Sequence, residues 1–147
     1  MLSGSSAPWA AHDPAALDRL GEVVGASGRP VLGICAGMQL LGRFGGGQID
    51  HAAEAEIGEL EVEVVDHEGL FRDVGDRPRV WQYHSDELTG LPAGFRLLAS
   101  TDRCRVQAFA HEQLPWWGTQ FHPESYRSAN PDGARILHTF FELAGER

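Results

Sequence analysis

Residues 30–41 read PVLGICAGMQLL, a stretch in which an apolar strand turns directly into a helix. The run VLGIC at 31–35 is short and continuously apolar, which is typical of a buried parallel strand. The segment AGMQLLGRF at 36–44 follows as a predicted helix, and three consecutive glycines end it. We therefore predict a strand–turn–helix unit with Cys35 at the turn.

Cys35 lies between Gly33 and Gly37 in a G-x-C-x-G pattern, the nucleophile-elbow pattern with cysteine in place of serine. Such a sharp turn lifts the side chain out of the sheet edge, and the two glycines keep crowded positions free of side chains. The start of the following helix offers backbone N–H groups that lower the pKa of a thiol and can hold an oxyanion. Taken alone, the pentapeptide is equally consistent with a small buried cysteine on a core strand.

A cysteine nucleophile requires a base, and His122 is the candidate among the seven histidines of the chain. It ends the apolar stretch WWGTQFH at 116–122 and begins the tripeptide HPE. The side chains of His122 and Glu124 are two residues apart and can leave the backbone on the same side, with Pro123 fixing the bend. This arrangement would supply a base and a carboxylate that orients it, although HPE alone also describes a turn with a surface glutamate.

The remaining elements follow the order expected of a mixed α/β domain. Asp13 as N-cap and Pro14 at the first helical position begin a helix that ends between Gly25 and Pro30. Alternating side chains over 58–66 indicate a strand with one buried face and a solvated row of glutamates. Further strands are predicted at 79–84, 95–100, 105–111 and 116–122, and a last helix at 131–144.

Composition and charge exclude several kinds of function. The net charge of −9 argues against a nucleic-acid surface, and the absence of lysine excludes lysine-nucleophile chemistry. The N-terminus lacks a basic region before an apolar core, and no apolar run could span a bilayer, so we expect a cytoplasmic protein without membrane association. Cys35 and Cys104 do not form a disulfide framework, and without CxxC or HxxxH spacing no metal site is predicted. With 147 residues and no linker, a single domain is expected over residues 1–147.

Taken together, PVLGICAGMQLL and WWGTQFHPE resemble the glutaminase domain of class I (triad-type) glutamine amidotransferases. The likeness extends through LFRDV at 70–74, VWQYHSDELTGLPAGFRLLAST at 80–101 and GARILHTFFE at 133–142, and is nearest to the glutaminase domain of GMP synthetase and its stand-alone relatives. The resemblance implies a flavodoxin-like, three-layer α/β domain with a mixed sheet. It also implies hydrolysis of the glutamine side-chain amide through a γ-glutamyl thioester, without a cofactor, to supply ammonia to a synthetase partner.

The same resemblance assigns roles to individual residues. Cys35 would be the nucleophile, His122 the general base and acid, and Glu124 the carboxylate that orients the imidazole. The N–H group of Ala36 and the loop containing Gly4 would hold the oxyanion. The predicted substrate-binding residues are Gln39, one helical turn after the cysteine, and the YHSD segment of Tyr83, His84, Ser85 and Asp86.

The N-terminus departs from the family pattern. Family members begin with strands and helices before a loop of the SGGP type, whereas this chain opens at MLSGSSAPW, with Gly4 retained and Ser5 in place of the second glycine. We therefore expect a domain that lacks the N-terminal strands, and three explanations stay open: the sequence is a fragment or starts at the wrong codon, another chain or a second copy of this one supplies the strands, or the domain is reduced. Three hypotheses stay open: a glutaminase that feeds a synthetase partner, a stand-alone amidase or γ-glutamyl hydrolase on a small metabolite, and a truncated, catalytically poor chain with a structural role.

Overall fold

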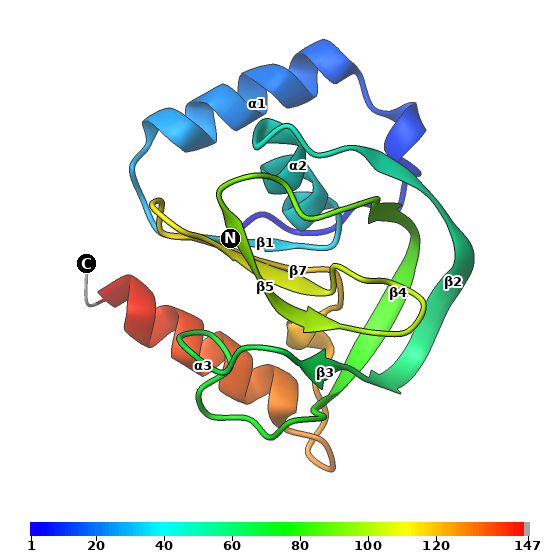
Figure 1. Cartoon of the computed structure of the whole chain (residues 1–147), viewed down its shortest axis with the longest axis vertical. Helices are drawn as coiled ribbons and strands as arrows, with labels where there is room; N and C mark the ends of the chain where they lie inside the picture. The colour runs from blue at the N-terminus through cyan, green and yellow to red at the C-terminus, as the bar shows by residue number, and fades with distance from the viewer. Residues whose placement is uncertain (146–147) are drawn as a thin grey trace.

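The computed structural model describes residues 1–145, in which helices cover both faces of a mixed sheet and a second, small sheet lies at one side (Figure 1). The helical elements are η1 (Trp9–Ala11), α1 (Pro14–Ala26), α2 (Ala36–Phe44), η2 (Pro123–Ser125) and α3 (Asp132–Gly145). The strands are β1 (Val31–Ile34), β2 (Ile49–Glu61), β3 (Glu63–Val64), β4 (Arg79–Leu88), β5 (Phe95–Ser100), β6 (Ala108–His111) and β7 (Trp116–Thr119).

The larger sheet has five strands in the order β1-β7-β6-β5-β3. β1 runs parallel to β7, with Val31 opposite Trp116, whereas the other neighbouring pairs are antiparallel. The predicted mixed sheet is therefore confirmed. Because β1 and β7 are parallel, their carboxyl ends lie at the same edge of the sheet, so Cys35 after one and His122 after the other reach the same region.

Two hydrophobic cores fill the space between the sheet and the helices, one on each face of the sheet. Trp116 packs with Met38 of α2 in the core below α1 and α2, while the adjacent Trp117 points to the other face and packs with Phe140 of α3. This alternation follows from the two-residue period of a strand that is covered on both faces. Figure 1 shows α1 and α2 on one side of the sheet and α3 on the other, which confirms the predicted three-layer arrangement.

The second sheet consists of β2 and β4, paired antiparallel. The strand predicted at 58–66 is divided, because β2 ends at Glu61 and β3 begins at Glu63 in the other sheet. Its alternation is confirmed, since Val62 and Val64 are both buried. The first half of β2 was not predicted, because its alanine and glutamate residues have weak strand preference and pairing with β4 determines their conformation.

The first residues of the chain pack along the outer side of β1. Leu2 N–H donates to the Leu32 carbonyl at 2.9 Å, and Ile34 N–H donates to the Leu2 carbonyl at 2.8 Å, which makes a parallel bridge to Gly33. This bridge directs the following loop across the end of β1. Within residues 1–145, no helix combines the length and hydropathy that crossing a bilayer requires.

Candidate active site

Cys35 occupies the turn between β1 and α2, as predicted. Its backbone has φ 53°, and among residues 1–145 it is the one non-glycine residue with a positive φ. Two backbone hydrogen bonds hold this conformation: Cys35 N–H donates to the Thr119 carbonyl at 2.8 Å, and Gln39 N–H donates to the Cys35 carbonyl at 3.0 Å. A non-glycine residue held in this sparsely populated region is a common feature of functional sites.

The two glycines of the pattern are required by close backbone packing. A Cβ atom on Gly33 would lie 2.6 Å from the carbonyl carbon of Gly37. A Cβ atom on Gly37 would overlap the Leu2 carbonyl. β1, α2 and the N-terminal segment therefore meet so closely around Cys35 that neither position has room for a side chain.

His122 and Glu124 form the pair that the HPE tripeptide predicts. His122 Nδ1 lies 2.7 Å from Glu124 Oε1, and the backbone N–H of His122 donates to the Trp81 carbonyl at 2.8 Å. The Cys35 thiol and the Glu124 carboxylate raise the pKa of His122 to about 9, against burial, which lowers it. His122 Nε2 is buried without a hydrogen bond of normal geometry to residues 1–145, so the thiol acts on this pKa through its proximity.

Gly4 lies directly against both Cys35 and His122. A Cβ atom on Gly4 would lie 3.1 Å from His122 Cε1, 3.3 Å from Cys35 Cβ and 3.8 Å from Cys35 Sγ. The N-terminal loop therefore passes over the cysteine–histidine pair. Ala36, the other predicted oxyanion residue, is the first residue of α2.

A pocket of about 220 Å³ opens beside Cys35. Cys35 and Ala36 line it together with every predicted substrate-binding residue, namely Gln39, Tyr83, His84, Ser85 and Asp86. Residues 5–9 of the N-terminal loop form another part of its wall. His122 and Glu124 are not among the residues that line this pocket.

Gln120, which the sequence motifs did not indicate, links Gln39 to the thiol. Gln39 is buried, and its Nε2 donates to the Asp86 carbonyl at 2.8 Å and to Gln120 Oε1 at 3.1 Å. Gln120 Nε2 in turn lies 3.7 Å from Cys35 Sγ. A buried amide between an apolar strand and the HPE tripeptide was the available signal in the sequence, because such a group needs polar partners.

The Asp86 carboxylate connects the N-terminal loop to the pocket. Its Oδ2 accepts a 2.7 Å hydrogen bond from the backbone N–H of Trp9, and its Oδ1 lies 3.1 Å from Nδ1 of the exposed His51. Both carboxylate oxygens thus have protein partners. Asp86 therefore shapes the pocket wall by these contacts.

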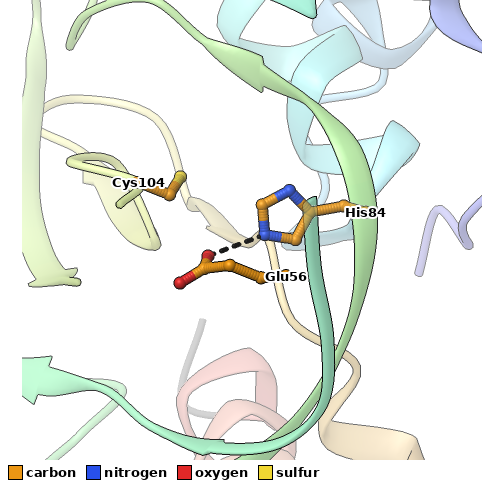
Figure 2. A group of neighbouring side chains, drawn as sticks. All are labelled: Glu56, His84 and Cys104. Atoms are coloured by element: carbon orange, nitrogen blue, oxygen red, sulfur yellow. Dashed lines mark hydrogen bonds and ion pairs between the residues drawn. The ribbon is translucent and has the colours of Figure 1, made fainter. Parts of the chain in front are cut away.

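Behind the pocket lie three buried side chains with metal-ligating atoms, Glu56, His84 and Cys104 (Figure 2). These atoms lie within 4.8 Å of one another. Glu56 Oε2 is 3.0 Å from His84 Nε2, so the pair is already joined by a hydrogen bond. Cys104 is a free thiol, and burial raises its pKa, which makes the neutral form dominant. The arrangement is that of a hydrogen-bonded carboxylate–imidazole pair beside a thiol, and Glu56 is a further residue that the sequence did not indicate.

The family model for class I glutamine amidotransferases matches residues 5–144. The chain is 43% identical over 117 residues to a glutamine-hydrolysing GMP synthase subunit from Pyrococcus furiosus, and 44% identical over 119 residues to the protein of the same name from Methanopyrus kandleri. Each alignment covers 80% of this chain. The chain spans only 61% of the first relative's length and 62% of the second's.

Solved structures agree with these sequence matches. A GMP synthase subunit from Thermoplasma acidophilum superposes with a TM-score of 0.88 at 33% identity, over 99% of this chain and 71% of that one. A glutamine amidotransferase from Thermotoga maritima superposes with a TM-score of 0.69 at 28% identity, over 90% of this chain and 54% of that one. Sequence and fold lead to the same conclusion: the chain belongs to the class I glutamine amidotransferase family.

Proposed function

We propose that this chain hydrolyses the side-chain amide of glutamine through a thioester on Cys35. The observation that carries the proposal is the conformation of Cys35, held with a positive φ at the start of α2, beside both the His122–Glu124 pair and a pocket of about 220 Å³. A thiol in this position has a base on one side and room for a small amide on the other. These are the requirements of covalent acyl transfer.

The reaction would begin with the ion pair of a Cys35 thiolate and a His122 imidazolium. The thiolate attacks the amide carbon, the C–N bond breaks, and His122 gives its Nε2 proton to the leaving nitrogen, which departs as ammonia. Water then attacks the thioester and gives a proton to His122, the C–S bond breaks, and glutamate leaves. Glu124 keeps the imidazole oriented and stabilises its charge in both steps.

The remaining roles follow from position around the thiol. The N–H of Ala36, at the positive end of α2, and the backbone of the Gly4 loop would hold the oxyanion of the tetrahedral intermediates. The walls formed by Gln39 and by residues 83–86 would hold the amino-acid end of glutamine. Gln120 would orient the thiol through its amide.

We further propose that the ammonia passes to a separate synthetase chain. What supports this is the name of the relatives from Pyrococcus furiosus and Methanopyrus kandleri, which describes a glutamine-hydrolysing subunit of GMP synthase. In this proposal the synthetase chain binds to this one and receives the ammonia directly. The alternative of a self-sufficient amidase predicts hydrolysis of other small amides without any partner.

A covalent probe tests the proposal. Incubation with a diazo-ketone analogue of glutamine should give one adduct per chain, located on the Cys35 peptide by mass spectrometry. Cys104→Ser should give the same adduct, and Cys35→Ser should give none while ammonia release from glutamine falls by at least about a thousandfold. A folded protein without the adduct would refute the glutaminase proposal and favour a structural role.

The partner is tested separately, by measuring ammonia release with and without the synthetase chain of a related organism and its nucleotide substrates. A rise on addition supports the proposed partner. Equal turnover in both conditions, together with hydrolysis of other amides, would instead support the stand-alone amidase.

A further inference from the structure

A buried polar network around Glu56 lies behind the pocket wall and takes no part in the proposed thioester chemistry. Glu56 of β2 and His84 of β4 face each other, with side chains only 2% and 1% exposed (Figure 2). His84 also lines the pocket beside Cys35. The network therefore reaches from the interior of the small sheet to the site where substrate is proposed to bind.

Glu56 is surrounded by hydrogen-bond donors. Thr101 Oγ1 donates to Oε1 at 2.8 Å and Gln107 Nε2 donates to Oε2 at 2.5 Å. The Gln107 amide is fixed in direction, because its Oε1 accepts from Gln82 Nε2, and the Thr101 hydroxyl accepts from the Cys104 backbone N–H while it donates to Glu56. Burial raises the pKa of Glu56, but the hydrogen bonds from the imidazole, Thr101 and Gln107 outweigh it, and the pKa is lowered overall. Glu56 is therefore an ionised carboxylate.

His84 faces an acceptor with each ring nitrogen. Nε2 meets the Glu56 carboxylate at 3.0 Å, and Nδ1 lies 3.3 Å from the Asp86 carbonyl. A neutral imidazole carries a single N–H, so only the imidazolium can donate to both acceptors. The imidazolium also balances the charge of Glu56, which would be costly to bury alone.

The Asp86 carbonyl connects this pair to the nucleophile's helix. It accepts from His84 Nδ1 and also from Gln39 Nε2 at 2.8 Å, so it ties β4 to α2. We propose that Glu56 is a positioning residue that holds His84 as an imidazolium and thereby fixes the 83–86 wall of the substrate pocket. This inference rests on the proposed glutaminase function, because the wall it fixes is the one assigned to glutamine.

The neighbouring titratable groups leave this assignment unchanged. Cys104 is a neutral thiol because burial raises its pKa, and Glu87 lies beside that thiol. The Asp86 carboxylate is directed to Trp9 and His51. The titratable groups near His84 are Glu56 of β2, Asp86 and Glu87 of β4, Cys104 between β5 and β6, and Cys35, which lines the same pocket.

Glu56→Gln tests the proposal with almost no change of shape. The retained oxygen still accepts from Gln107 and from His84 Nε2, but the charge is gone. Without that charge the neutral imidazole, which has a single N–H, becomes the favoured form of His84, and a lone pair then faces one of its two acceptors. We expect the KM for glutamine to be about tenfold higher than in the unsubstituted chain, with kcat changed less.

The matched control is Glu54→Gln, two residues earlier on β2, where an exposed ion pair with Arg103 is lost. Its KM and kcat should stay close to those of the unsubstituted chain. An unchanged KM for Glu56→Gln, or a loss of kcat as large as the rise in KM, would indicate a merely structural role and would overturn the proposal.

A measurement on the unsubstituted chain does not depend on activity or on the variant's folding. Nitrogen-15 NMR of the histidine rings at about pH 7 should show both His84 nitrogens protonated. A single protonated nitrogen, or a Zn²⁺ ion bound one per chain and lost in Cys104→Ala, would overturn the proposal. Absence of glutamine hydrolysis and of a Cys35 adduct would refute the proposed function, while the NMR result would still report on the Glu56–His84 pair.

Discussion

The residue types around Cys35 depend on the room that the packed backbone leaves as much as on the chemistry of the site. The glycine spacing in GICAG was sufficient to predict a turn with a projecting thiol, because glycine is the residue that tolerates such close backbone packing. The contact of Gly37 with the Leu2 carbonyl was not predictable, because Leu2 lies more than thirty residues earlier in the sequence, whereas Gly4 lies against Cys35 and His122. The loop at the start of the chain is therefore as much a part of the site as the elbow.

Gly4→Ala should reduce glutaminase kcat/KM by about tenfold to a hundredfold with the fold retained. The added methyl group would press on His122 Cε1 at 3.1 Å and on Cys35 Cβ at 3.3 Å, moving the thiol, the imidazole or the loop. Steady-state ammonia release measures the effect. Gly75→Ala is the control, because nothing lies within 4 Å of its Cβ position, and equal activities of the two variants would contradict the placement of the loop.

The raised pKa of His122 predicts a pH-dependent contribution to stability. Proximity to the Cys35 thiol is the largest cause, followed by Glu124, and together they raise the pKa from 6.5 to about 9. Because the folded pKa is higher, the contribution is fully present below about pH 6.5 and is lost as pH rises through about 9. The site is partly open to water, so we expect a contribution on the order of 1–3 kcal/mol.

The measurement is urea unfolding of the unsubstituted chain and of Cys35→Ala between about pH 6.5 and about pH 8.5. The pH-dependent part of the difference in unfolding free energy should shrink across this range as His122 loses its proton. Cys104→Ala removes a buried thiol that lies beside Glu56 and His84 instead, and its difference should stay nearly constant. A constant difference for Cys35→Ala as well would show that the thiol does not raise this pKa.

At the scale of elements, α3 shows how one helix serves as the lower layer. Phe140 is 4% exposed and its ring lies 5.9 Å from that of Trp117, whereas the adjacent Phe141 is 58% exposed. Phe140→Ala should lower the free energy of unfolding by about 3–5 kcal/mol because it leaves a cavity in the core. Phe141→Ala should cost less than about 1 kcal/mol. Urea denaturation of both variants measures this, and comparable losses would contradict the orientation of α3.

Elements differed in how far their sequence determined them. α1, α2 and α3 were predictable because capping residues and the spacing of apolar residues are local signals. The strand over 58–66 was recognised by alternation, but its division between β2 and β3 was not, because the two halves have the same pattern and differ only in their pairing partner. Strand pairing is a long-range contact, and local preference does not specify it.

For the whole molecule, the arrangement of layers brings the site together from distant parts of the chain. Cys35 follows β1 and His122 follows β7, and the parallel pairing of these two strands places both residues at one sheet edge. The small β2–β4 sheet supplies the pocket wall, and the N-terminal loop closes over it through the contact of Trp9 N–H with Asp86. The substrate pocket is therefore a property of the folded chain and of no single motif.

The sequence by itself determined which residues carry the chemistry. A glycine-flanked cysteine at a strand–helix junction and a histidine two residues before a glutamate are local patterns whose meaning depends on backbone geometry. Only the tertiary structure decided which buried polar groups surround them: Gln120 beside the thiol and Glu56 behind His84. The physical reason is that a buried polar group is specified by its partners, and here those partners lie tens of residues away along the chain.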